Sequence, residues 1–158
     1  MHSIHVALTL VRWGAEAEAV AAGLLHDVVE DCAEKGWSRE RMEEEFGERV
    51  AGIVAEVTED KRCSWEERKQ AQLDHVPGLS EDALAVKAAD LLHNMSSLAM
   101  ELEANGADDG LWDRFSRGRE GTLWFGGHMV AALGPRVAPA VSEELSEALD
   151  RLSRAAGL

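Results

Sequence analysis

The sequence predicts an all-α fold, and three observations support this prediction. Ala, Leu, Glu and Arg, which favour helices, are frequent throughout the 158 residues. Stretches that alternate between apolar and polar residues, as half-buried strands do, are missing. Glycine and proline instead separate segments whose apolar residues recur at helical spacing. We therefore expect a helical bundle around one core, as a single domain over residues 1–158.

Glycines divide the first half of the chain into short helices. Gly14, Gly36 and Gly47 each follow a segment expected to be helical, and glycine commonly ends a helix. Ser64 and Glu67 have the spacing of a capping box, which satisfies backbone N–H groups at the start of a helix. The helices expected here cover residues 3–13, 16–33, 38–46, 47–59 and 65–75.

The second half is expected to contain longer helices. Ser80 can cap the first of them, and Asn105-Gly106 and Gly134-Pro135 separate the others. The expected helices cover residues 80–104, 109–133 and 139–156, and the core is expected within about residues 2–134. The last helix is amphipathic, and its stripe either packs on the bundle, which we favour, or forms a homodimer contact. That stripe consists of Val141, Leu145, Leu149 and Leu152.

The composition excludes several classes of protein. The net charge of −14 argues against a DNA or RNA partner, because binding to phosphates needs a basic surface. No apolar run approaches the roughly 20 residues that span a bilayer, and the chain does not open with a secretory signal. Cys32 and Cys63 lie far apart and form no C-x-x-C motif. These features predict a cytoplasmic protein that binds neither nucleic acid nor a membrane.

Residues 23–31, GLLHDVVED, place an imidazole and three carboxylates among aliphatic residues. Successive residues on one continuous helix are about 100° apart. One side of such a helix would carry Gly23, which leaves room, and the polar residues His26, Asp27, Glu30 and Asp31. The other side, expected to face the core, would carry Leu24, Leu25, Val28 and Val29. The segment is either a solvated acidic face with one core histidine or half of a metal site.

Two further segments offer ligands of the same kind. Asp90 lies in the apolar-rich stretch VKAADLLHNM, and an aspartate is rarely buried without a partner. That partner could be Lys87, three residues earlier, or a metal. At the start of the chain either His2 or His5 could be a ligand, although a surface position is commoner for one histidine. Imidazoles and carboxylates together suit a divalent ion such as Mn²⁺, Fe²⁺ or Zn²⁺.

The motifs taken together resemble one enzyme family. LLHDVVED is followed by FGERVAGIVAEVTEDK, ERKQAQLDHVPGLS and AVKAADLLHNMSSL. This series is similar to that of the HD-domain hydrolases of the RelA/SpoT type, above all the small stand-alone hydrolases that remove the 3′-pyrophosphate of (p)ppGpp. The resemblance covers the chain from His2 to Leu133. It implies an HD-domain helical bundle and a metal-dependent phosphohydrolase that acts on a phosphorylated nucleotide.

The resemblance also implies a metal site. The family's first ligand is a histidine followed by x-x-x-Val-Ala, which matches His2 rather than His5. The His-Asp pair and the aspartate of the V-K-x-A-D motif supply the remaining ligands of a single ion, which in the family is Mn²⁺. In this chain those ligands are His26, Asp27 and Asp90.

Other residues are implied to act on the water and the substrate. Glu30 and Asp31 would position and activate the water, and Asn94 would lie at the substrate. Lys61 and Lys87 are our first choices for phosphate contact. The other basic residues considered, most of them expected at the surface, are Arg12, Arg62, Arg68, Lys69, Arg114, Arg117 and Arg119.

The chain departs from the family pattern in ways that leave the substrate open. A basic H-x-x-Q-R-R/K element that contacts guanosine precedes the first ligand in the family and is absent here, and Ser96-Ser97 stand where an arginine is common. Trp124 or Phe125 could stack on a base, although core packing is favoured. A nucleotidase or another HD phosphomonoesterase is therefore an alternative enzyme. A non-catalytic nucleotide-binding module is the alternative from another class.

Overall fold

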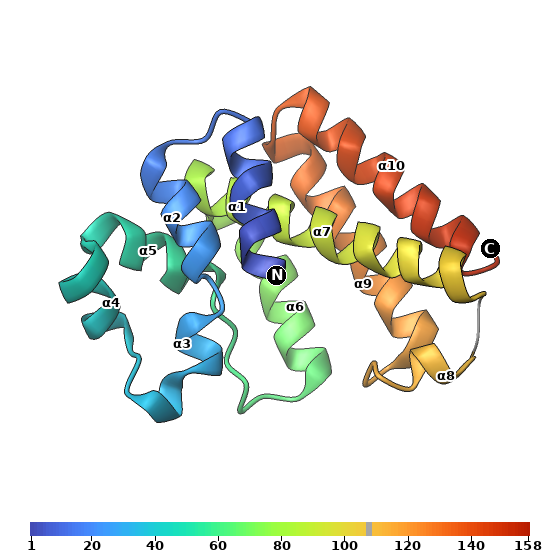
Figure 1. Ribbon diagram of the computed structural model, residues 1–158, viewed down its shortest axis with the longest axis horizontal. Helices are drawn as coiled ribbons and strands as arrows, with labels where there is room; N and C mark the ends of the chain where they lie inside the picture. Colours follow the sequence, from blue (N-terminus) through green and yellow to red (C-terminus); the bar gives the residue numbers. More distant parts are fainter. Residues whose placement is uncertain (107–108) are drawn as a thin grey trace. The chain divides into compact units, whose positions relative to one another are not determined.

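The computed structural model describes residues 1–106 and 109–158 of the chain (Figure 1). Across these residues the regular structure is helical and no strand is present, which confirms the all-α prediction. None of the helices in these two ranges is both long and apolar enough to span a bilayer. The chain forms two compact units, Met1–Asp90 and Leu91–Leu158. The single domain over residues 1–158 stays a prediction.

The first unit begins with two helices that pack against each other, α1 (His2–Arg12) and α2 (Ala17–Leu25) (Figure 1). After α3 (Val28–Asp31) and the 3₁₀ turn η1 (Ala33–Lys35), α4 (Arg39–Phe46) packs on α5 (Glu48–Val57), which also contacts α2. The largest fully buried side chains of these helices are Val6, Leu10, Met42 and Val54. This apolar layer holds α1 against α2, which positions the residues discussed below.

The end of the first unit contains two predicted helix caps. α6 (Trp65–His75) begins with a capping box in which Ser64 Oγ accepts the Glu67 N–H at 3.3 Å and Glu67 Oε2 accepts the Ser64 N–H at 2.8 Å. After the 3₁₀ turn η2 (Val76–Gly78), Ser80 caps α7 (Glu81–Asn105) by accepting the Ala83 N–H at 3.2 Å. Both caps confirm the sequence predictions.

The second unit contains the later part of α7, α8 (Asp109–Trp112), α9 (Gly118–Leu133), the 3₁₀ turn η3 (Gly134–Arg136) and α10 (Pro139–Ala155). α10 packs on α9 and buries one face, as expected for packing on the bundle. That face consists of Val141, Leu145, Ala148 and Leu152. A homodimer contact through α10 stays a prediction.

The helix expected over residues 109–133 is broken. Between α8 and α9, Phe115 and Gly118 donate to carbonyls three residues earlier, as in turns rather than α-helices. Gly118 has a φ of +55°, in the left-handed region that favours glycine. Core packing was also the wrong expectation for Trp124, which is 42% exposed and lies 4.5 Å from the His128 ring, centroid to centroid.

Candidate metal centre

The predicted ligands His26 and Asp27 lie at a break between two helices rather than inside one. α2 ends at Leu25 and α3 begins at Val28, so the helix expected over residues 16–33 is interrupted. His26 Nδ1–H donates to the Gly23 carbonyl at 2.9 Å, which in a continuous α-helix would accept from the N–H of residue 27. Asp27 has φ −90° and ψ −7°, in the sparsely allowed region where many active-site residues lie.

The core prediction for the aliphatic residues of this segment was wrong. Leu24 is 44% exposed, and Leu25, Val28 and Val29 are only partly buried. The buried face of α2 is instead formed by Ala19, Ala22 and Gly23, and His26, 6% exposed, continues it at helical spacing. The residues on this face are small because a neighbouring helix lies close to it.

That neighbour is α1, and Gly23 permits its approach. A Cβ at Gly23 would lie 2.4 Å from Leu10 Cδ1 and 3.3 Å from Val6 Cγ1, so any side chain there would displace these buried side chains of α1. The expectation that Gly23 leaves room beside the carboxylates is therefore wrong. The close packing brings His2, on the first turn of α1, to His26 at the end of α2, with 3.2 Å between their Nε2 atoms.

Four residues of the first unit, His2, His26, Asp27 and Asp90, converge and are called the metal cluster below. His2 Nε2 lies 3.1 Å from Asp90 Oδ1 and 3.8 Å from Asp27 Oδ2. His26 Nε2 lies 3.2 Å from Asp27 Oδ1 and 3.8 Å from Asp90 Oδ1. Ligands bound at about 2.1 Å to one first-row ion lie about 3.0–3.5 Å from each other, so these separations suit a single ion.

The donor chemistry of the metal cluster also fits a divalent ion. Because the Gly23 carbonyl can only accept, the proton of a neutral His26 sits on Nδ1, and the Nε2 lone pair points toward Asp27 and Asp90. A backbone carbonyl in this position is a common way to orient a metal-binding histidine. His5, the alternative first ligand, is exposed on α1. Donor atoms of His2, His26 and Asp90 all lie within 4.8 Å of one another.

The contacts in the metal cluster shift two pKa values in opposite directions. The hydrogen bond to Asp90 raises the pKa of His2. Burial alone would lower this pKa, but the negative charges of Asp90 and Asp27 raise it further. Burial alone would raise the pKa of Asp90, but the His2 hydrogen bond and the nearby positive charges lower it. Asp90 is therefore ionised at neutral pH, and a metal competes with protons for His2 more strongly than it would at an ordinary histidine.

A cavity of about 60 Å³ adjoins the metal cluster within the first unit. Five charged side chains line this cavity: Asp27, Glu30, Glu59, Lys87 and Asp90. His26, Val57 and Val86 form the rest of its lining. The volume is enough for one or more waters. Acidic and basic groups thus surround a space in which water can lie beside the metal cluster.

Glu30 and Asp31 are neighbours in sequence but occupy different environments. The Glu30 side chain is 12% exposed and lines the cavity, and burial raises the pKa of its carboxyl. The Asp31 side chain is 61% exposed and accepts from Lys61 Nζ at 2.5 Å. Lys61 Nζ also lies 3.6 Å from Glu30 Oε2. Of the two predicted catalytic carboxylates, Glu30 is the one that faces the water-sized space.

The predicted substrate contacts fall in two places. Lys87 lines the cavity, and its charge and that of Asp90 attract each other, so the alternative of a Lys87–Asp90 pair stays open. Burial lowers the pKa of Lys87, and the negative charges of Asp90 and Glu59, which would raise it, offset this only in part. Asn94 belongs to the second unit, and its role stays a prediction.

The sequence analysis missed Glu59, which contacts Glu30 from the loop after α5. Its carboxylate binds Arg68, Lys69 and Gln72 of α6, and these four residues are called the Glu59 network below. Arg68 and Lys69, expected at the surface, are 23% and 17% exposed in their side chains. The charged run "ERK" in a capped helix was the available signal, but it did not indicate which acid the cations would meet.

Comparisons with known proteins identify the family of the chain. The family model of the HD domain matches residues 1–121. The chain is 40% identical over 99 residues to the guanosine-3′,5′-bis(diphosphate) 3′-pyrophosphohydrolase MESH1 of Xenopus tropicalis, covering 61% of this chain and 54% of that protein. It is 38% identical over 99 residues to human MESH1, with the same coverage. The chain thus spans about half the length of these relatives.

Two solved structures are similar over nearly the whole chain. The crystal structure of lmo0812 from Listeria monocytogenes has a TM-score of 0.83 and 30% identity, covering 95% of this chain and 97% of that one. A metazoan ortholog of SpoT, reported to hydrolyse ppGpp, has a TM-score of 0.73 and 31% identity, covering 99% and 80%. These findings confirm the resemblance inferred from the motifs. The chain belongs to the HD-domain family.

Proposed function

We propose that this chain is a metal-dependent phosphohydrolase that removes the 3′-pyrophosphate of ppGpp. The observation that carries the proposal is the convergence of the metal cluster and Glu30 on one small cavity. The substrate is proposed from similarity to proteins named guanosine-3′,5′-bis(diphosphate) 3′-pyrophosphohydrolases. We retain a cytoplasmic location in the proposal because Cys32 and Cys63 are free thiols.

His2, His26, Asp27 and Asp90 would hold one divalent ion, which we propose to be Mn²⁺. Two imidazoles with two carboxylates suit such an ion, and the Gly23 carbonyl fixes the tautomer of His26. When bound, the ion would supply Lewis acidity toward a phosphoryl oxygen and lower the pKa of a water.

Glu30 is proposed to accept the proton of the attacking water. Its carboxylate lines the cavity, and its raised pKa makes it a better base than an ordinary glutamate. The water oxygen bonds to phosphorus as the bond from that phosphorus to the 3′-oxygen breaks. The pyrophosphate released contains the water oxygen, and the proton that Glu30 accepted passes to the 3′-oxygen, which leaves as the 3′-hydroxyl of GDP. Asp31 would assist through Lys61, which binds Asp31 and lies 3.6 Å from Glu30 Oε2.

Cationic side chains are needed to receive a polyphosphate on a protein of net charge −14. Lys87 is the first candidate, because it borders the cavity beside the metal cluster. Lys61 is the second, half exposed beside Glu30. Asn94 is proposed as a further substrate contact, four residues after Asp90 on α7.

The test is to incubate the purified chain with Mn²⁺ and either ppGpp or deoxynucleoside monophosphates. We expect pyrophosphate and GDP from ppGpp, with no release by the His26→Ala variant. Phosphate release from the monophosphates alone would instead identify a nucleotidase. Binding of ppGpp without hydrolysis in excess Mn²⁺ would identify a non-catalytic nucleotide-binding module.

A further inference from the structure

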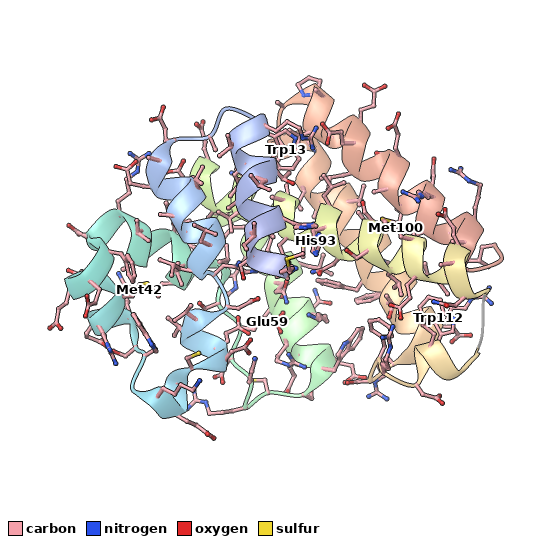
Figure 2. All side chains as sticks on the ribbon, viewed as in Figure 1. Trp13, Met42, Glu59, His93, Met100 and Trp112 are labelled. Carbon is pink, nitrogen blue, oxygen red and sulfur yellow. The ribbon has the colours of Figure 1, made fainter. Side chains whose placement is uncertain are left out.

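Glu59 contacts Glu30 through its backbone and α6 through its side chain. The Glu59 N–H donates to Glu30 Oε1 at 2.7 Å. The Glu59 carboxylate accepts from Arg68 Nη1 at 2.7 Å, from Lys69 Nζ at 2.8 Å and from Gln72 Nε2. Figure 2 labels Glu59, between α3 and α6. One residue therefore joins the cavity carboxylate to a neighbouring helix.

The backbone around Glu59 lacks support from a helix of its own. α5 ends at Val57, and α6 begins only at Trp65. Thr58 closes α5 by donating its N–H and its hydroxyl to the Val54 carbonyl. Glu59 is therefore tied to α5 through Thr58 on one side and to α6 through its own side chain on the other.

The Glu59 network is well suited to this task. The side chains of Glu59, Arg68 and Lys69 are 14%, 23% and 17% exposed, so solvent screens their attraction only in part. Burial alone would raise the pKa of Glu59, but the Lys69 hydrogen bond and the surrounding cations lower it. An ionised carboxylate with several charge-assisted hydrogen bonds is held in a defined position.

We propose that Glu59 is a positioning residue for the reaction. Its carboxylate, anchored on α6 by Lys69 and Arg68, holds its own N–H against Glu30 and so fixes the direction of that carboxylate toward the cavity. The inference rests on the proposed role of Glu30. It adds the reason why the Glu59 network, which does not touch the metal cluster, is needed for turnover.

The neighbouring Asp60 provides a matched control. Its carboxylate binds the backbone and side chain of Arg62 within the same loop, and Arg62 is 90% exposed. Asp60→Asn therefore removes a charge and hydrogen bonds from this loop without touching the link to α6. A general loosening of the loop would affect both variants, whereas positioning of Glu30 depends on Glu59 and Lys69.

The kinetic test compares Glu59→Gln, Lys69→Met and Asp60→Asn. We expect the first two to lower kcat by about 10–100-fold with KM and Mn²⁺ affinity nearly unchanged, and Lys69→Arg to restore most of the loss. Asp60→Asn should retain wild-type kcat. In a Glu30→Gln background, Glu59→Gln should cause little further loss, because it acts through Glu30. Equal losses in both backgrounds, or an equal loss from Asp60→Asn, would overturn the proposal.

An activity-independent measurement separates this inference from the proposed function. Amide hydrogen exchange of the Glu59 N–H, followed by NMR, should be about tenfold faster in Lys69→Met and in Glu30→Ala than in the wild type. Unchanged exchange in both variants would refute the positioning role. If the wild type releases no pyrophosphate but the exchange changes as expected, the substrate is wrong and the link from Glu59 to Glu30 stands.

Discussion

Two clusters of charged side chains border the same cavity and differ in how their negative charge is balanced. In the metal cluster, the carboxylates of Asp27 and Asp90 contact the imidazoles of His2 and His26, which are positive only when protonated. In the Glu59 network, the carboxylate contacts two permanent cations, Arg68 and Lys69. The first arrangement attracts a further cation, whereas the second is complete without one.

This difference suits the metal cluster to binding an ion and the Glu59 network to holding Glu30 in position. A cluster whose partners must lose protons gains from a divalent ion, and its energy depends on pH and metal concentration. A network that holds its charges by lysine and arginine keeps the same geometry with or without the ion. We therefore expect changes in the metal cluster to affect metal binding, and changes around Glu30 and Glu59 to affect turnover alone.

The largest effect is expected from Asp90→Ala, which should abolish Mn²⁺ binding and turnover together. Asp90 contacts both imidazoles, and its loss leaves them without the carboxylate that draws an ion between them. Isothermal titration calorimetry with Mn²⁺ measures the binding. Lys69→Met, which changes the Glu59 network, should keep wild-type Mn²⁺ affinity. Tight Mn²⁺ binding by Asp90→Ala would show that the metal cluster is not the site.

The next largest effect on turnover is expected to distinguish the adjacent carboxylates of Glu30 and Asp31. Glu30→Gln should lower kcat by about 10²–10⁴-fold, the usual contribution of a general base, and leave Mn²⁺ affinity unchanged. Asp31→Asn should cost less than about fivefold, because its contact with Lys61 is an exposed ion pair. Pre-steady-state pyrophosphate release measures both. A larger loss in Asp31→Asn than in Glu30→Gln would reverse the roles assigned to them.

The sequence predicted the members of the metal cluster better than their surroundings. The family resemblance implied His2, His26, Asp27 and Asp90 as ligands, and the structure brings their side chains together, while their role as metal ligands stays a prediction. The break after Leu25 was missed because a side-chain hydrogen bond to the Gly23 carbonyl leaves no trace in hydrophobic periodicity.

Long-range contacts account for the other differences. The roles of Gly23 and Glu59 depend on α1 and α6, which approach them from elsewhere in the chain. A helical wheel shows which residues share a face, but it does not show which helix packs there. Gly23 was therefore assigned to the wrong neighbour, and Lys69 to the surface.

A moderate effect of pH should also separate the clusters. Since Asp90 raises the pKa of His2, His2 keeps its proton at pH values above 6.5, the ordinary pKa of histidine. Mn²⁺ affinity should therefore fall with decreasing pH, approaching roughly tenfold per pH unit below the raised pKa. Without metal the trend is opposite: the His2–Asp90 contribution to stability is full below the unfolded-state pKa and lost as pH rises through the folded-state pKa.

Titration calorimetry and thermal melts across pH 5 to 9, with and without chelator, measure the two trends. His5→Gln, on the exposed side of α1, is the matched control and should keep both. His2→Gln should lose the metal-free trend. A metal-free stability that does not change with pH in the wild type would argue against the His2–Asp90 contact.

The smallest effect is expected from Gly23→Ala, which tests how α1 carries His2 into the metal cluster. The added Cβ would lie 2.4 Å from Leu10 Cδ1, so the buried Leu10 side chain must move, and α1 with it where the core leaves no room, at a cost of about 1–3 kcal/mol in the free energy of unfolding. Mn²⁺ affinity should fall too, because His2 moves with α1. Gly52→Ala in α5 is the control, since its Cβ meets nothing within 4 Å, and alanine should stabilise that helix by up to about 1 kcal/mol. If chemical denaturation gives the two variants the same stability, α1 does not pack on Gly23, and the position of His2 must be set by another contact.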